Sequence, residues 1–215
     1  MKYFFSSDFH FNHVNILTYS KRPFKNVEEM NETIITNWNS RVSPNDVGFF
    51  LGDFVFGGES EVARFLSRLN GTINIIFGNH DKSLRNFAKH VVLNKVNYLG
   101  DYAEVTINGQ FIVLSHYAFR VWNRSHYGSY NLYAHSHGSL PDDPNARAID
   151  VGVDCHNFYP ISFEQVAAIM EKKNWKPIDH HGERLQDGGV GLSKDDYAKA
   201  ERKRDYEILN KEFEP

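Results

Sequence analysis

The sequence predicts an α/β fold in which two mixed β-sheets pack face to face and helices flank them, a four-layer αββα sandwich. Three observations predict it. Short apolar runs alternate with helical patterns over residues 2–89, as expected for parallel strands joined by crossover helices. The dipeptide Asn108-Gly109 separates two further apolar runs, and it is a strong signal for an antiparallel hairpin. Several runs end directly in Asp, Asn or His, so a metal site is expected at the carboxyl ends of the strands.

The first half of the chain is expected to have the order β-α-β-α-β, followed by a short helix. Its elements are a strand at 2–7 followed by a loop, a helix at 26–39, a strand at 47–51, a helix near 59–69, a strand at 73–77 and a short helix near 82–89. The helix at 26–39 carries Met30, Ile34 and Trp38 at helical spacing, and Asn26 is placed to cap it. This alternation favours a parallel sheet.

The second half changes character. It is expected to contain a hairpin at 102–107 and 110–115, strands near 130–134 and 147–153, and an amphipathic helix near 161–172. At 215 residues and 41% hydrophobic content, we expect one metal-binding domain over residues 1–178. Residues 179–215 are expected to add a loop (180–191) and a highly charged helix (193–213) that packs on the domain, which we favour over a dimerisation helix.

Bulk composition limits the partners and the compartment. A net charge of −3 gives no whole-surface attraction to nucleic acid or to an anionic membrane. The single Cys155 cannot form an internal disulfide, and no charged-then-apolar leader or membrane-length apolar run is present. We therefore predict a cytoplasmic protein without membrane association. The sequence leaves the oligomeric state open.

The residues that follow the apolar runs form a ligand set. They are Asp8, His10, Asp53, Asn79, His116, His135 and His137. Two divalent ions about 3.5–4 Å apart can activate a water and hold a phosphoryl group. Asp53 is a lone acid after Gly52 and is the natural bridge between two ions, whereas Asp8 and His10, two apart on the extension of a strand, are expected to project to the same side. With no thiolate among the ligands, Mn, Fe, Zn, Co or Ni is favoured.

In order and type these residues resemble the calcineurin-like metallophosphoesterase superfamily. That pattern is Asp-x-His, Gly-Asp, Gly-Asn-His-Asp/Glu, a lone His, and Gly-His-x-His. It appears here as Asp8-Phe9-His10, Gly52-Asp53, Gly78-Asn79-His80-Asp81, His116 and Ala134-His135-Ser136-His137. The opening Ser7-Asp8-Phe9-His10-Phe11-Asn12-His13 resembles a small bacterial and phage branch of the superfamily.

The resemblance implies a role for each residue. Asp8, His10, Asp53 and His137 would bind a first ion, and Asp53, Asn79, His116 and His135 a second. His80 would stabilise developing charge or protonate the leaving alkoxide, and Asp81 would orient His80. The nucleophile would be a hydroxide bridging the ions. Ala134 replaces the usual Gly, which we expect to be tolerated, and no arginine follows Gly52-Asp53 as in protein phosphatases of the superfamily, which argues against that activity.

We therefore expect hydrolysis of a phosphodiester or phosphomonoester bond in a small, nucleotide-like substrate. The alternative is a nuclease acting on DNA or RNA ends, although long nucleic acid is disfavoured by the charge. Candidates to contact the substrate are His13, Arg22, Arg120 and Arg124. Each arginine is explained equally well by surface solubility, and His13 equally well as the start of a short helix.

Overall fold

The computed structural model describes residues 1–178, so the expected loop and helix of residues 179–215 lie outside the described part of the chain. Its elements follow in the order β1 (Tyr3–Ser6), α1 (Ile16–Tyr19), α2 (Val27–Arg41), β2 (Val47–Phe50), α3 (Glu59–Arg68), β3 (Thr72–Ile76), α4 (Lys82–Ala88), β4 (Val96–Gly100), β5 (Tyr102–Ile107), β6 (Gln110–Ser115), β7 (Tyr130–Tyr133), β8 (Ala148–Asp150), β9 (Ile161–Ser162) and α5 (Phe163–Glu171). A short 3₁₀ helix at Val153–Cys155 follows β8.

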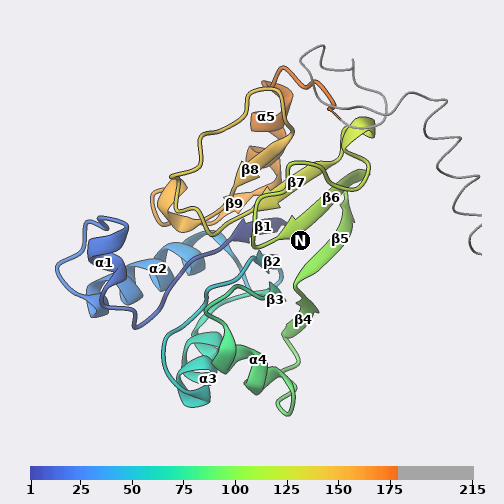
Figure 1. The fold of residues 1–215 in the computed structure, drawn as a ribbon. Helices are drawn as coiled ribbons and strands as arrows, with labels where there is room; N and C mark the ends of the chain where they lie inside the picture. The colour runs from blue at the N-terminus through green and yellow to red at the C-terminus, as the bar shows by residue number, and fades with distance from the viewer. Residues whose placement is uncertain (179–215) are drawn as a thin grey trace, which may run out of the picture. The chain divides into compact units, whose positions relative to one another are not determined.

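The strands form two mixed sheets (Figure 1). The first has the order β4-β3-β2-β1-β9, in which β1 to β4 are parallel and β9 runs antiparallel to β1. The second has the order β5-β6-β7-β8, with the expected β5–β6 hairpin followed by parallel pairing of β6, β7 and β8. The predicted class, two mixed sheets flanked by helices, is confirmed.

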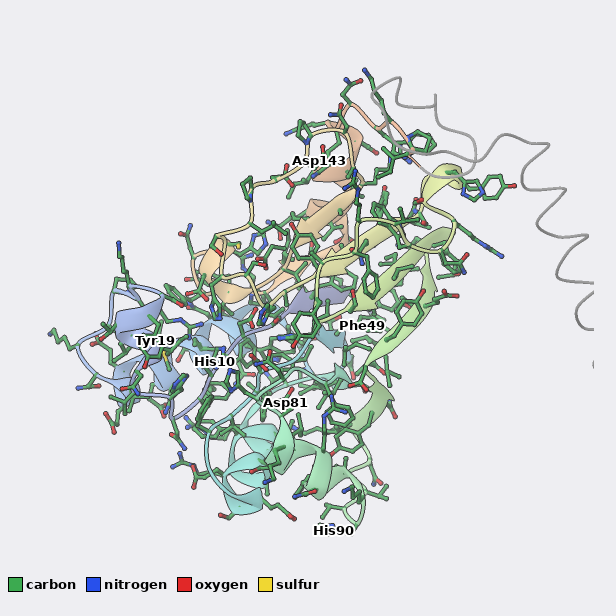
Figure 2. All side chains as sticks on the ribbon, viewed as in Figure 1. His10, Tyr19, Phe49, Asp81, His90 and Asp143 are labelled. Carbon is green, nitrogen blue, oxygen red and sulfur yellow. The ribbon has the colours of Figure 1, made fainter. Side chains whose placement is uncertain are left out.

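Strands β1 and β2 of the first sheet each contribute side chains to two apolar cores, because successive side chains point to opposite faces. Phe5 and Phe49 lie in the core between the sheets with their rings stacked at 5.4 Å, and Figure 2 labels Phe49 there. Phe4 and Phe50 face the other way, into the core under α2, α3 and α4. Burying each of these rings contributes about 1.5–3 kcal/mol. The two cores hold the ends of β1 and β2 in a fixed position.

The boundaries of the helices follow local signals. Asn26 caps α2 as predicted, since its Oδ1 accepts from the Glu29 main-chain N–H at 2.8 Å. The helix expected near 161–172 begins two residues later, because Ile161 and Ser162 pair with β1 as strand β9. Ser162 also closes a capping box with Gln165 at the start of α5.

Two described strands, β4 and β9, were not expected from the sequence, whereas α1 lies where a short helix was one of the two explanations of His13. The helix α1 is a single turn, and β9 has two residues, so neither gives a periodic pattern. Strand β4 is a half-buried edge strand in which Asn97 interrupts the apolar residues. Within residues 1–178, no helix combines the length and the apolar character needed to cross a membrane.

Candidate metal centre

The loops that follow β1, β2, β3, β6 and β7 bring the predicted ligands together in two groups. In the first group, Asp8, His10 and His137 each offer a ligand atom, and these atoms lie within 4.8 Å of one another. The second group meets the same criterion with Asp53, His116 and His135. In Figure 2, His10 lies between the sheet and α1, which carries Tyr19. The sequence placed these six residues at one site, and the fold brings them there.

Asp53 faces both groups with one oxygen. Its Oδ2 lies 3.5 Å from His10 Nε2 and 3.6 Å from His116 Nε2. Its Oδ1 accepts a hydrogen bond of 2.9 Å from the main-chain N–H of His80. One carboxylate oxygen is thus almost equally distant from an imidazole of each group, which is the arrangement that a bridging ligand requires.

The first group contains buried polar atoms that a cation would satisfy. Asp8 Oδ1 and both ring nitrogens of His10 are buried and have no hydrogen-bond partner within residues 1–178. Asp8 Oδ1 is 3.9 Å from Nε2 of His10 and 3.9 Å from Nε2 of His137. Such orphaned groups are rare in folded proteins, because their desolvation is uncompensated. The donor set therefore fits a divalent cation at this position.

The pKa shifts in the first group also favour the binding of a cation. Burial raises the pKa of Asp8 to about 7. Burial, aided by the positive charges of His137 and Arg22, lowers the pKa of His10 below its ordinary value. The unligated site therefore favours a neutral imidazole at His10 and holds a proton at Asp8 that a bound cation would displace.

The second group is oriented by main-chain contacts. His116 Nδ1 donates to the carbonyl oxygen of Leu51 at 2.7 Å, so its Nε2 presents a lone pair. That Nε2 lies 3.0 Å from Asn79 Oδ1, which also offers lone pairs. Two acceptors at this distance fit two ligands of one cation. Burial, followed by the nearby His116, lowers the pKa of His135 and favours its neutral form.

Five of the predicted ligands lie in the left-handed backbone region, at φ 56° for Asp8, 51° for His10, 60° for Asp53, 69° for His135 and 47° for His137. The expectation that Asp8 and His10 continue a strand is therefore wrong. Non-glycine residues adopt this region uncommonly, and such strain concentrates at functional sites. The left-handed turns, and not strand alternation, bring the side chains of each pair into the site.

Two glycines allow the loops to approach closely beneath the ligands. A Cβ on Gly52, at φ +97°, would lie 2.4 Å from the Gly78 main-chain nitrogen. A Cβ on Gly78 would lie 2.2 Å from Asp53 Oδ1. The close turn predicted at Gly52 is thus present. The methyl group of Ala134, by contrast, is accommodated in the core between the sheets.

Asp81 has a different position from the one expected. Its carboxylate accepts three main-chain N–H groups, from Gly78 at 2.7 Å and from Asp53 and Phe54 at 2.8 Å each. No hydrogen bond joins it to the His80 ring within residues 1–178. Asp81 therefore ties the Asp53 loop to the Gly78 turn and does not orient His80 directly. Burial raises its pKa above the ordinary value.

Arg22 does not line the cavity that opens over the first group. It is buried, and its guanidinium donates to both carboxylate oxygens of Asp154 at 2.9 and 2.8 Å and to the carbonyl oxygens of Asp8 and Phe9 at 2.6 and 3.0 Å. Asp154 in turn accepts from His137 Nδ1–H at 2.7 Å. Neither of the two expected roles of Arg22, phosphate binding and surface solubility, matches this position.

Asp154 was missed by sequence reasoning. One signal could have found it, since it follows the predicted strand at 147–153 as the ligands follow theirs. Burial alone would raise its pKa, but the hydrogen bonds from His137 and Arg22 hold the pKa below the ordinary value. Asp154 is therefore an anion that fixes the orientation of His137.

A cavity of about 660 Å³ opens over the first group. Its lining includes His10, His13, Tyr19, Lys21, Asp53, Phe56, His80, His135 and His137. The His13 ring stacks on Phe56 at 3.8 Å, and the exposed His80 lies beside Phe56 at 5.2 Å. His13 is thus a cavity residue, as one of its two expected roles required, and Phe56 and Tyr19 are lining residues that the sequence did not indicate.

The other two candidate arginines lie elsewhere. Arg120 lines a separate cavity with Trp122, and the Arg124 guanidinium lies over the Phe111 ring at 4.6 Å. Neither lines the cavity over the metal ligands. Tyr117, directly after the predicted ligand His116, lies close to the centre, with its ring 4.7 Å from that of His135.

Comparison with known proteins gives a consistent result. The family described as calcineurin-like phosphoesterase matches residues 1–209. An uncharacterized protein of Methanocaldococcus jannaschii is 34% identical over 178 residues, which cover 80% of this chain and 92% of that protein. A solved structure of a protein of unknown function from Aquifex aeolicus is similar with a TM-score of 0.57 and 24% identity, over 78% of this chain and 98% of that one. A phosphoesterase from E. coli gives a TM-score of 0.37 and 20% identity, over 71% and 78% of the two chains.

Proposed function

The chain belongs to the calcineurin-like phosphoesterase family, and on that premise we propose that it hydrolyses a phosphodiester or phosphomonoester bond in a small, nucleotide-like substrate with the help of two divalent ions. The observation that carries the proposal is the shared Asp53 oxygen, 3.5 Å from one imidazole group and 3.6 Å from the other. If the Asp53 carboxylate had only a structural role, we would expect a hydrogen-bond donor to contact this oxygen. Here the same oxygen faces two imidazole nitrogens, which supports a bridging role.

The ligands divide between the two ions. Asp8, His10, Asp53 and His137 would hold the first, and Asp53, Asn79, His116 and His135 the second, with support from the two groups described above. Two such cations polarise a water and neutralise phosphoryl oxygens. We propose Mn, Fe, Zn, Co or Ni because the ligands are imidazole, carboxylate and amide.

His80 is proposed to donate a proton to the leaving oxygen or a hydrogen bond to a phosphoryl oxygen. Its main-chain N–H is fixed on Asp53 Oδ1 at 2.9 Å, whereas its ring is exposed to the cavity. The backbone is thus held at the ligand cluster and the imidazole remains free to meet a substrate. His13, stacked on Phe56 beside it, is proposed to contact the substrate.

A small substrate is supported by the cavity of about 660 Å³ and by the net charge of −3. The alternative, a nuclease acting on DNA or RNA ends, would need additional contacts to a polyanion. We also propose that residues 1–178 carry the whole catalytic unit and that the protein acts in the cytoplasm.

A screen with added metals tests the function. Purified protein is stripped with EDTA, reloaded with Mn²⁺, Zn²⁺, Co²⁺ or Ni²⁺, and assayed on bis-p-nitrophenyl phosphate, p-nitrophenyl phosphate and cyclic nucleotides. We expect turnover on at least one of them, and two bound ions per chain by elemental analysis. The variant Asp53→Asn should lose the turnover and should no longer bind two ions, since the substitution removes the shared carboxylate. Correctly folded protein that takes up one ion, or none, would contradict the proposal, and faster cleavage of long duplex DNA would favour the nuclease.

A further inference from the structure

A second cavity adjoins the metal centre on the side of Asn79. It has a volume of about 620 Å³ and lies between α4 and the neighbouring strands β3 and β4, which Figure 1 shows beside α4. Its lining is Phe77, Asn79, Lys82, Arg85, Asn86, Ala88, Lys89, Tyr98 and Gly100. Asn79 thus belongs both to this cavity and to the second ligand group, where its Oδ1 lies 3.0 Å from His116 Nε2.

The charged residues in the lining of this cavity are all basic. Lys82, Arg85 and Lys89 follow one another at spacings of three and four, so they lie on one face of α4 and its end. No acidic residue lines the cavity. Like charges at this spacing destabilise a helix, and an anion placed between them would relieve the repulsion.

The two lysines are available for a ligand. Lys82 is exposed and makes no hydrogen bond or ion pair with any residue in the range 1–178. Lys89 is exposed, and among residues 1–178 its Nζ donates only to Asn86 Oδ1, at 3.2 Å. Tyr98 adds a buried hydroxyl with no partner among the described residues. Arg85, by contrast, is engaged, because it pairs with Asp101 and lies over the Phe77 ring at 4.5 Å.

A smaller cavity of about 240 Å³ shares Phe77, Asn79 and Arg85 with this one. Its lining also includes His116 and Tyr117 beside the metal centre, and Asp101, the partner of Arg85. A substrate bound at the metal ligands could therefore extend past Asn79 into the cavity that Lys82 lines. Lys82 and Lys89 are seven residues apart, which corresponds to about 10 Å along a helix.

We propose that the cavity beside α4 binds a second phosphate group of the substrate, so that the preferred substrates carry a phosphate in addition to the one that is hydrolysed. Lys82 and Lys89 would hold that group, and Asn79 would mark the boundary between the two phosphates. This inference rests on the proposed phosphoesterase function. A compact cavity with two available lysines suits one small anionic group better than a long polyanion, for which many spaced phosphate contacts are needed.

Binding of phosphonates tests the site, because their C–P bonds are not hydrolysed. Hexylphosphonate and hexane-1,6-diphosphonate differ only in the second anionic group, and isothermal titration calorimetry of the metal-loaded full chain gives their affinity ratio. We expect the diphosphonate to bind native protein about tenfold more tightly, the effect of one charge-assisted contact, and the advantage to shrink as salt is raised. In the double variant Lys82→Ala/Lys89→Ala the ratio should fall to about 2 or less.

The matched control is Lys25→Ala/Lys172→Ala, which removes two exposed lysines that line neither cavity. It should keep the native ratio. An unchanged ratio in Lys82→Ala/Lys89→Ala would overturn the site. Equal affinities of native protein for the monophosphonate and the diphosphonate would also overturn it. A third refuting result would be lysine-dependent binding of single-stranded oligonucleotides that strengthens with their length, since that would identify a binding surface for nucleic acid. Absence of chromogenic turnover would contradict the proposed function separately, because the affinity ratio does not depend on catalysis.

Discussion

Replacing Asp154 by Asn should weaken both the fold and the binding of the first ion. The guanidinium of Arg22 has no exposed surface and the Asp154 side chain is 8% exposed, so their ion pair is buried. Breaking a buried pair by neutralising one partner costs about 3–5 kcal/mol. Because Arg22 keeps its hydrogen bonds to the carbonyl oxygens of Asp8 and Phe9, and Asn keeps one acceptor oxygen, we expect about 3 kcal/mol.

The same substitution leaves His137 without its anionic partner. Burial lowers the pKa of His137, but the hydrogen bond to Asp154 and the charge of Asp8 raise it above the ordinary value, so Asp154 is what holds the ring with Nδ1–H inward and Nε2 toward the ligands. Loss of such a partner weakens metal binding by about 10–100-fold. We therefore predict lower affinity for one of two ions, with the second retained.

Urea unfolding of metal-free protein and competition with a metal-indicator dye measure these effects. The matched control is Glu32→Gln, which breaks a bidentate pair with Arg68 of the same chemistry that is exposed on α2 and α3. Exposed pairs contribute about 0–1 kcal/mol, so the control should lose little stability and no metal affinity. If Asp154→Asn changes neither quantity more than Glu32→Gln does, the positioning role assigned to Asp154 is refuted.

Three further substitutions give distinct outcomes. His80→Ala should reduce turnover about 10²–10⁴-fold with unchanged metal content. The control His90→Ala, at an exposed histidine, should change neither turnover nor metal content. Loss of metal from His80→Ala would mean that His80 is a ligand. Gly52→Ala should cost about 1–3 kcal/mol more than Gly109→Ala in urea unfolding, because both have positive φ but only Gly52 lacks space for a Cβ. Asp8, with a folded pKa of about 7 against an ordinary 3.8, stabilises the metal-free protein only while protonated. The stabilisation by Asp8 should therefore be present near pH 4 and fall by about 4 kcal/mol by pH 8. It is measured as the difference in unfolding free energy between native protein and Asp8→Asn. A difference that does not change between pH 4 and pH 8 would contradict the prediction.

The order of elements and the identity of the ligand cluster were predictable because they depend on local patterns. Apolar runs predicted the strands, and the polar residues after them predicted which side chains meet, since parallel strand ends share one edge. The capping of α2 by Asn26 and the hairpin at Asn108-Gly109 depend on neighbouring residues alone. Strand β4 could not be found in this way, because its place in the sheet comes from pairing with β3 and not from its own alternation.

The supports of the ligands were not predictable, because they are long-range contacts of residues that look ordinary in sequence. Asp81 was expected to act on its neighbour His80, but its oxygens reach the main chain of residues 53 and 54, which lie on another loop. Likewise, no local signal separates the buried Arg22 from the exposed Arg120. Burial of an arginine depends on whether a distant acid, here Asp154, arrives beside it.

Arg22 explains how the strained ligand loop is held before a metal binds. Asp8 and His10 adopt left-handed backbone, which is unfavourable for non-glycine residues. The guanidinium of Arg22 bonds the carbonyl oxygens of Asp8 and Phe9, inside that loop, and at the same time pairs with Asp154, which orients His137. The buried guanidinium thus connects two of the four proposed ligands of the first ion, Asp8 directly and His137 through Asp154. Because these hydrogen bonds are made by the protein alone, the strain is offset during folding, and metal binding does not have to supply that free energy.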